Sequence, residues 1–163
     1  MILTPHLLIG ATIGAKTHNL GLIIMLGLLS HLILDRIPHW DYPNPGISNF
    51  KKTKDLKRFI FDLLKIVIDG VVGIIIVFLL VRKTDLRLDI RNLIFILLGI
   101  IFATLPDIFL FFSFTVLSPE ISRKIINFHN KFFHCKKEGH RITFLNLTTE
   151  IIVIFLAILV FFS

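Results

Sequence analysis

The sequence predicts an all-α integral membrane protein: a helical bundle with an N-terminal helical hairpin, about three further transmembrane helices and an interfacial helix. The chain of 163 residues is 55% hydrophobic and contains 17 Phe, with a mean hydropathy of +0.84. A soluble domain of this length does not need so much apolar surface. The apolar residues also form long runs, at roughly 59–81, 90–117 and 148–163, and about 17–25 helical residues span the hydrocarbon of a membrane.

The N-terminal apolar region predicts two short antiparallel helices. Thr4 and Pro5 are typical of the cap and first turn of a helix. The polar stretch KTHNLG contains Asn and Gly, which favour a turn. The second helix is expected to stop before Pro38. Folding back within KTHNLG brings His6 level with His31.

The three longer runs predict transmembrane helices, and polar segments separate them. NFKKTKDLKR precedes the first run, and RKTDLRLDIR joins it to the second. Pro106 lies inside the second run, where a kink or break is expected. The segment SPEISRKIINFHNKFFHCKKEGHR is polar and basic, which is typical of an interfacial helix followed by a loop. We expect residues 1–163 to form a single domain, because no linker or internal repeat interrupts them.

The basic residues indicate the orientation of this bundle. The net charge is +7, and anionic lipid head groups account for it better than nucleic acid, which is not an expected partner. Eleven Lys and Arg residues lie in segments 51–58 and 118–147, against four in the opposite connection, segment 82–91. The positive-inside rule makes the first side cytoplasmic. No basic segment precedes the first apolar run, so a cleaved signal peptide is not expected. The expected location is the cytoplasmic (inner) membrane.

Carboxylates and histidines gather at one face of this topology. The stretch SHLILDRIPHWDY carries His31, Asp35 and His39 at i, i+4 and i+8, which is one helical face if the helix continues that far. Imidazole nitrogens and carboxylate oxygens bind zinc, manganese or iron at about 2.0–2.2 Å. Asp69 and Asp107 lie within apolar runs, where a charge is costly without a partner. A divalent cation would serve several carboxylates at once.

The sequence therefore predicts a divalent metal site, with zinc favoured over manganese or iron. The expected metal ligands are His31, Asp35, His39 and Asp107, with His6 and Asp69 in support. The expected catalytic residues are His140, Glu150 and Asp41, of which Asp41 is also placed to orient an imidazole. The expected substrate-binding residues, for a phosphate, are Arg141, Lys136 and Lys137.

Structural roles compete with these chemical ones. His31 and Asp35 are about equally well explained as a hydrogen-bonded pair inside a bundle. His39 is also typical of an anchor at the membrane interface. His129 and His134 lie in an amphipathic segment, where a ligand role is the less favoured of the two.

Several motifs resemble a known family. TPHLLIGATIG, LLSHLILDRIPH, LPDIF and GHRITF are similar to elements of small bacterial inner-membrane proteins described as metal-dependent hydrolases. The resemblance implies a multi-helix membrane fold. It also implies metal-site roles for His6, His31, Asp35, Asp107 and His140. Phe109 stands where that family's Pro-Asp-x-Asp motif has its second Asp. HLILDRIPHWDY more faintly resembles the His/Asp-rich helices of zinc-dependent phospholipase C.

The expected function is that of a membrane-bound metal-dependent hydrolase acting at the cytoplasmic face. Its substrate would be a phosphoester or ester of a lipid or lipid-linked molecule. Two other functions stay open. The cluster could stabilise a non-catalytic membrane scaffold or metal-binding protein, or Asp69 and Asp107 could relay ions or protons through a conduit. The sequence does not indicate the oligomeric state.

Overall fold

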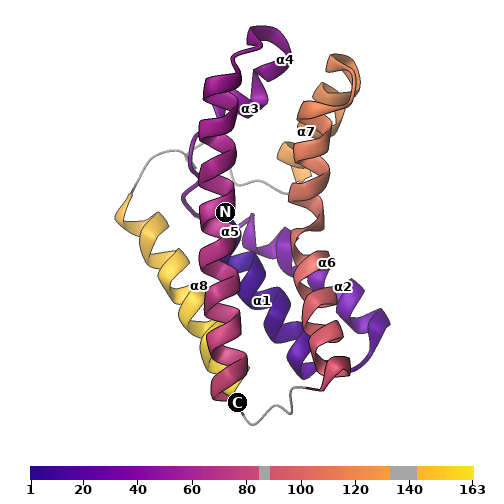
Figure 1. Ribbon diagram of the computed structural model, residues 1–163, viewed down its shortest axis with the longest axis vertical. Helices are drawn as coiled ribbons and strands as arrows, with labels where there is room; N and C mark the ends of the chain where they lie inside the picture. Colours follow the sequence, from indigo (N-terminus) through magenta and orange to yellow (C-terminus); the bar gives the residue numbers. More distant parts are fainter. Residues whose placement is uncertain (85–88, 133–142) are drawn as a thin grey trace.

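In the computed structural model, the described residues are 1–84, 89–132 and 143–163. Within them the chain forms helices and no strand, which confirms the predicted all-α class (Figure 1). The helices are α1 (Leu3–Lys16), α2 (Leu20–Leu34), α3 (Pro45–Ser48), α4 (Phe50–Thr53), α5 (Leu56–Lys83), α6 (Ile90–Thr115), α7 (Pro119–Phe132) and α8 (Phe144–Phe162).

The N-terminal hairpin is confirmed as α1 and α2, which are 14 and 15 residues long. The side-chain oxygen of Asn19 accepts a hydrogen bond from the Leu22 N–H at 3.1 Å. The residue expected to break the chain is thus also the N-cap of α2. α2 ends at Leu34, with Asp35 as its C-cap residue, so the helix stops before the irregular segment around Pro38.

Among the described residues, three helices are long and apolar enough to cross a membrane, namely α5, α6 and α8, with 28, 26 and 19 residues. They correspond to the three predicted apolar runs, and the protein is an integral membrane protein. α6 remains helical through Pro106 and does not break there. Large apolar side chains along all three helices are exposed, as expected for surfaces that face lipid tails.

The first helix lies at the centre of the bundle. α1 packs against α2, α5, α6 and α8. Its approach to α6 requires glycine: a Cβ at Gly10 would lie 2.5 Å from the carbonyl oxygen of Gly99, and a Cβ at Gly14 would lie 2.2 Å from that of Phe95. Small residues allow the two backbones to touch, and this contact fixes α1 and the histidine it carries.

The long helices α5 and α6 extend over most of the length of the molecule, and each of the other helices lies beside one half of it (Figure 1). α1, α2 and α8 lie beside one half, and α3, α4 and α7 lie beside the other. α7 is the amphipathic helix expected at an interface, with Ser122 and His129 buried while Arg123 and Lys124 are exposed. The beginning of α1 and the end of α2 both lie near the middle of the bundle's length (Figure 1).

Candidate metal centre

Three predicted ligands meet in the interior at that level. His6 from α1, His31 from α2 and Asp35 at the end of α2 are exposed by only 0%, 0% and 2%. One ligand atom from each lies within 4.8 Å of the other two. The packing of α1 against α2 and α6 brings them together, which confirms the expectation that His6 lies level with His31.

The two distances between imidazole and carboxylate in this group are close to the edge of a metal coordination polyhedron. His6 Nε2 lies 3.3 Å from Asp35 Oδ1, and His31 Nε2 lies 3.2 Å from Asp35 Oδ2. Yet both Nε2 atoms are buried without a hydrogen-bond partner, which is costly for a polar atom. Ligand atoms at about 2.0–2.2 Å from a tetrahedral ion lie roughly 3.3–3.6 Å apart. The buried group can hold a metal ion.

One backbone contact prepares His31 for such a role. Its Nδ1–H donates to the carbonyl oxygen of Ala103 on α6 at 2.9 Å. With the proton fixed on Nδ1, a neutral His31 ring would offer Nε2, the nitrogen nearer Asp35, to a metal ion. The sequence offers no signal for a carbonyl partner, because any residue type can supply it.

Two further side chains border the group. Asp107 Oδ1 lies 3.8 Å from His31 Nε2, and 35% of the Asp107 side chain is exposed. His129 Nε2, on α7, lies 4.0 Å from Asp35 Oδ2. Asp107 and His129 thus provide a carboxylate oxygen and an imidazole nitrogen at the edge of the group. Asp107 also connects the buried group to the outside of the bundle.

His39 and Asp41 form a separate pair beside this group. Because α2 ends at Leu34, His39 does not continue the helical face of His31, and its Nε2 contacts Asp41 Oδ2 at 3.3 Å instead. The amino group of Met1 lies 2.9 Å from Asp41 and 3.1 Å from Asp35. Burial raises the pKa of Asp41, but the hydrogen bond with His39 and the charged amino group lower it more, so this pKa lies well below its usual range.

Asp69, a predicted supporting ligand, is placed elsewhere and caps α1. Asp69 Oδ2 accepts a hydrogen bond from the Leu3 N–H at 2.5 Å, and Oδ1 accepts from the Thr4 N–H at 3.3 Å and the Thr4 hydroxyl at 2.5 Å. No side chain next to α1 in sequence caps this end. A carboxylate at a helix N-terminus also interacts favourably with the helix dipole. Asp69 therefore positions the turn that carries His6.

Glu150, a predicted catalytic residue, holds the segment that follows α2. Its carboxylate accepts a hydrogen bond from the Trp40 N–H at 3.1 Å. The neighbouring hydroxyl of Thr149 donates to the carbonyl oxygen of Pro38. α8 thus satisfies two backbone groups of an irregular segment.

α5 does the same further along that segment. Asp62 Oδ2 accepts from the Gly46 N–H at 2.6 Å, and Lys65 donates to the carbonyl oxygen of Pro43 at 3.1 Å. Side chains from two spanning helices thereby satisfy four backbone groups between Pro38 and Gly46. Non-helical backbone at membrane depth requires such partners.

The remaining predicted residues lie outside the part of the chain that the structure describes. They are the catalytic candidate His140, the phosphate-binding candidates Lys136, Lys137 and Arg141, and the alternative ligand His134.

Comparisons with known proteins add no relative: no family model matches the chain, and no curated protein or solved structure is significantly similar to it. The motif resemblance to the inner-membrane hydrolases therefore stays a prediction. The chemistry of the site has to be argued from its geometry.

Proposed function

We propose that this protein is a membrane-embedded metal-dependent hydrolase that acts on a phosphoester or ester bond of a lipid or lipid-linked molecule. One observation carries the proposal. Two buried imidazole Nε2 atoms approach the two oxygens of one carboxylate at 3.2 and 3.3 Å, yet neither has a hydrogen-bond partner. A shared cation between the three side chains would satisfy all of them.

His6, His31 and Asp35 would hold the ion, and their nitrogen and oxygen atoms suit zinc, with manganese or iron as alternatives. Such an ion supplies Lewis-acid activation of water and of the substrate's oxygen. Asp107 is the carboxylate best placed to accept a proton from water, because it is partly exposed and lies 3.8 Å from His31 Nε2. Asp69 holds the start of α1, the helix that carries His6. The carbonyl oxygen of Ala103 accepts a hydrogen bond from Nδ1–H of His31. These two contacts would orient the two imidazoles.

A lipid-borne substrate suits the surroundings of Asp107. The next two residues on α6, Ile108 and Phe109, are exposed by 43% and 56%. These side chains belong to the exposed apolar surface of α6, which is long enough to cross the membrane. A substrate with acyl or prenyl chains could therefore approach Asp107 from the membrane without leaving it. The charge asymmetry of the sequence favours the cytoplasmic leaflet as the source of this substrate.

A structural role for the cluster is the second candidate, and one contact favours it. The amino group of Met1 lies against both Asp35 and Asp41, so these carboxylates already have a positive charge beside them. In that case the cluster would stabilise the bundle without any turnover.

Metal analysis tests the metal site, and a turnover assay then separates the two candidates. The metal content of the detergent-purified protein is measured by elemental mass spectrometry, for the wild type, His31→Ala and Asp35→Ala. The control is His18→Ala, because His18 lies at the hairpin turn, where it contacts Asn92 at 3.2 Å. We expect near-stoichiometric metal in the wild type and in His18→Ala, and its loss in the other two.

Turnover is then tested on phospholipid and lipid-phosphate substrates. We expect Asp107→Asn to retain the metal and to lose at least about a hundredfold in rate, as a missing general base does. Folded wild-type protein that takes up no zinc, manganese or iron would refute the metal site. Metal binding without hydrolysis of any lipid ester or phosphoester would favour the structural candidate.

A further inference from the structure

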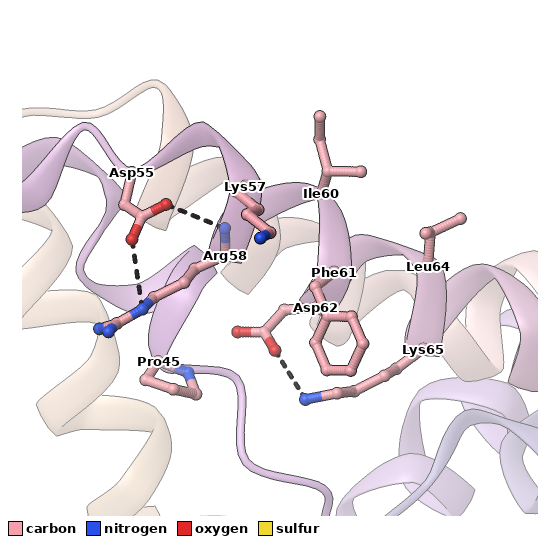
Figure 2. A pocket seen from close by; sticks show the side chains of 9 residues that line it. All are labelled: Pro45, Asp55, Lys57, Arg58, Ile60, Phe61, Asp62, Leu64 and Lys65. Atoms are coloured by element: carbon pink, nitrogen blue, oxygen red, sulfur yellow. Dashed lines mark hydrogen bonds and ion pairs between the residues drawn. The ribbon is translucent and has the colours of Figure 1, made fainter.

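A groove far from the metal centre lies at the N-terminal end of α5. It has a volume of about 760 Å³ and is open to the outside, which is within the usual size range of small-molecule sites. Figure 2 shows Arg58, Asp62 and Lys65 on the side of α5 that faces Pro45, while Ile60 and Leu64 project to another side. The groove therefore has one charged wall and one apolar wall.

We propose that this groove binds the head group of an anionic phospholipid. Lys57 and Arg58 would contact the phosphate, and the acyl chains would lie along the exposed apolar face of α5. The proposal does not depend on the metal centre or on hydrolysis. Position, charge and continuity with the membrane support it in turn.

The position of the groove matches the level of lipid head groups. The exposed apolar side chains that follow the charged pair on α5 begin at Ile60 and continue to Leu79. These two residues are about 28 Å apart along the helix axis, close to the hydrocarbon thickness of about 30 Å. Lys57 and Arg58 precede this stretch, and Arg82 follows it. The basic pair thus lies where phosphate groups meet the hydrocarbon.

The charges of the groove leave a cation available. Asp62 is bonded to the Gly46 N–H at 2.6 Å and to Lys65 at 2.7 Å. Asp55 contacts Arg58 at 3.2 Å in an exposed pair, which is a weak interaction that an anion can replace. Lys57 is exposed and has no ion pair within the described residues. With three basic and two acidic side chains lining it, the groove has a net positive charge.

The apolar wall favours a lipid over a free anion. Ile60, Phe61 and Leu64 are exposed by 46%, 63% and 50%, and they continue into the apolar face of the same helix at Ile68, exposed by 61%. A soluble phosphate would leave this surface uncovered. A second copy of the chain would bring the same charge against itself, because segment 51–58 contains five basic residues and one acidic residue.

The test uses native mass spectrometry of the detergent-purified full chain titrated with phosphatidylglycerol or phosphatidylcholine. The variant is Lys57→Gln with Arg58→Gln, and the matched control is Arg82→Gln with Lys83→Gln at the other end of α5. We expect the wild type to bind phosphatidylglycerol at least about tenfold more tightly than phosphatidylcholine. A basic residue near an anionic lipid contributes about fivefold, so the variant should lose about 25-fold and the control less than twofold.

Three outcomes would overturn the proposal. They are equal affinity for the two lipids, equal losses in variant and control, and displacement of phosphatidylglycerol by millimolar glycerol phosphate, which would indicate a site for a free anion. A single Lys57→Gln variant, expected to lose about fivefold, covers the case in which the double variant does not fold. Metal content serves as an independent readout, and we expect it to stay unchanged in every variant.

Discussion

Replacement of Asp69 by Asn tests whether α5 positions the metal ligand on α1. Asp69 accepts hydrogen bonds from Leu3 and Thr4, which precede His6 by three and two residues. An Asn side chain retains one acceptor oxygen and turns an NH₂ group toward the other donors. With its oxygen toward Thr4, the Leu3 N–H faces a donor and loses its partner.

The size of the effect follows from that lost bond. A hydrogen bond to a charged group contributes about 1.5–3 kcal/mol, so we expect Asp69→Asn to cost about 2 kcal/mol. If all of this falls on the placement of His6, the Kd for the metal rises by up to about thirtyfold, since 1.4 kcal/mol is a factor of ten. At saturating metal the stoichiometry should stay the same.

Competition with a chromophoric chelator measures this Kd. The matched control is Asp62→Asn, which removes another buried carboxylate of α5 from a backbone N–H, that of Gly46. We expect Asp62→Asn to lower the free energy of unfolding in an SDS titration and to leave the metal Kd within about twofold. Equal weakening of metal binding in the two variants would refute the reasoning, because general destabilisation would then explain both. An unchanged Kd in Asp69→Asn would show that the cap does not position His6.

Three further substitutions test other contacts. Gly14→Ala should cost about 1–3 kcal/mol of unfolding free energy in an SDS titration, because its Cβ would lie 2.2 Å from the Phe95 carbonyl oxygen. Glu150→Gln keeps an acceptor for the backbone N–H it holds, so any turnover should stay within about threefold, whereas loss of a general base costs at least about a hundredfold. Lys51→Met removes a cation from the C-terminal carbonyls of α6, including that of Ser113 at 3.2 Å, and should cost about 0.3–1 kcal/mol in the same titration.

Controls for these substitutions come from the same chain. Gly21→Ala should change the free energy of unfolding by less than about 0.5 kcal/mol, because its nearest neighbour is the Asn19 side chain at 3.3 Å. A similar loss in Gly14→Ala and Gly21→Ala would contradict the close approach of α1 and α6. A complete loss of turnover in Glu150→Gln would instead restore the catalytic role predicted from sequence.

The helices could be predicted because long apolar runs and helix breakers are local features. The stretch KTHNLG predicts the hairpin turn, and with it the meeting of His6 and His31, whose ring centroids lie 4.5 Å apart. Asp35 follows from the same reasoning, since the spacing i, i+4 places it beside His31 on one helical face.

Other parts of the site depend on contacts that the sequence does not record. The i+8 position of His39 requires a helix that continues past Leu34, and the helix ends there. Asp69 was expected to need a partner, but its partners are backbone N–H groups 65 and 66 residues away. The carbonyl of Ala103 that orients His31 has no signature in residue types at all. Sequence patterns therefore predict which side chains carry charge into the membrane more readily than which atom each will meet.

The short length of α1 and α2 explains why the site lies inside the bundle and not at its surface. Asp69 lies near the middle of the 28-residue α5, about 20 Å from either end, and it holds the start of α1 at that depth. The chain can leave helical structure there only if its backbone groups find partners, and side chains of α5 and α8, including Asp62 and Glu150, supply them. Glu150, a catalytic candidate in the sequence, thus holds an irregular segment in place together with Asp62. That arrangement leaves the Nε2 atoms of His6 and His31, beside Asp35, buried and without a hydrogen-bond partner.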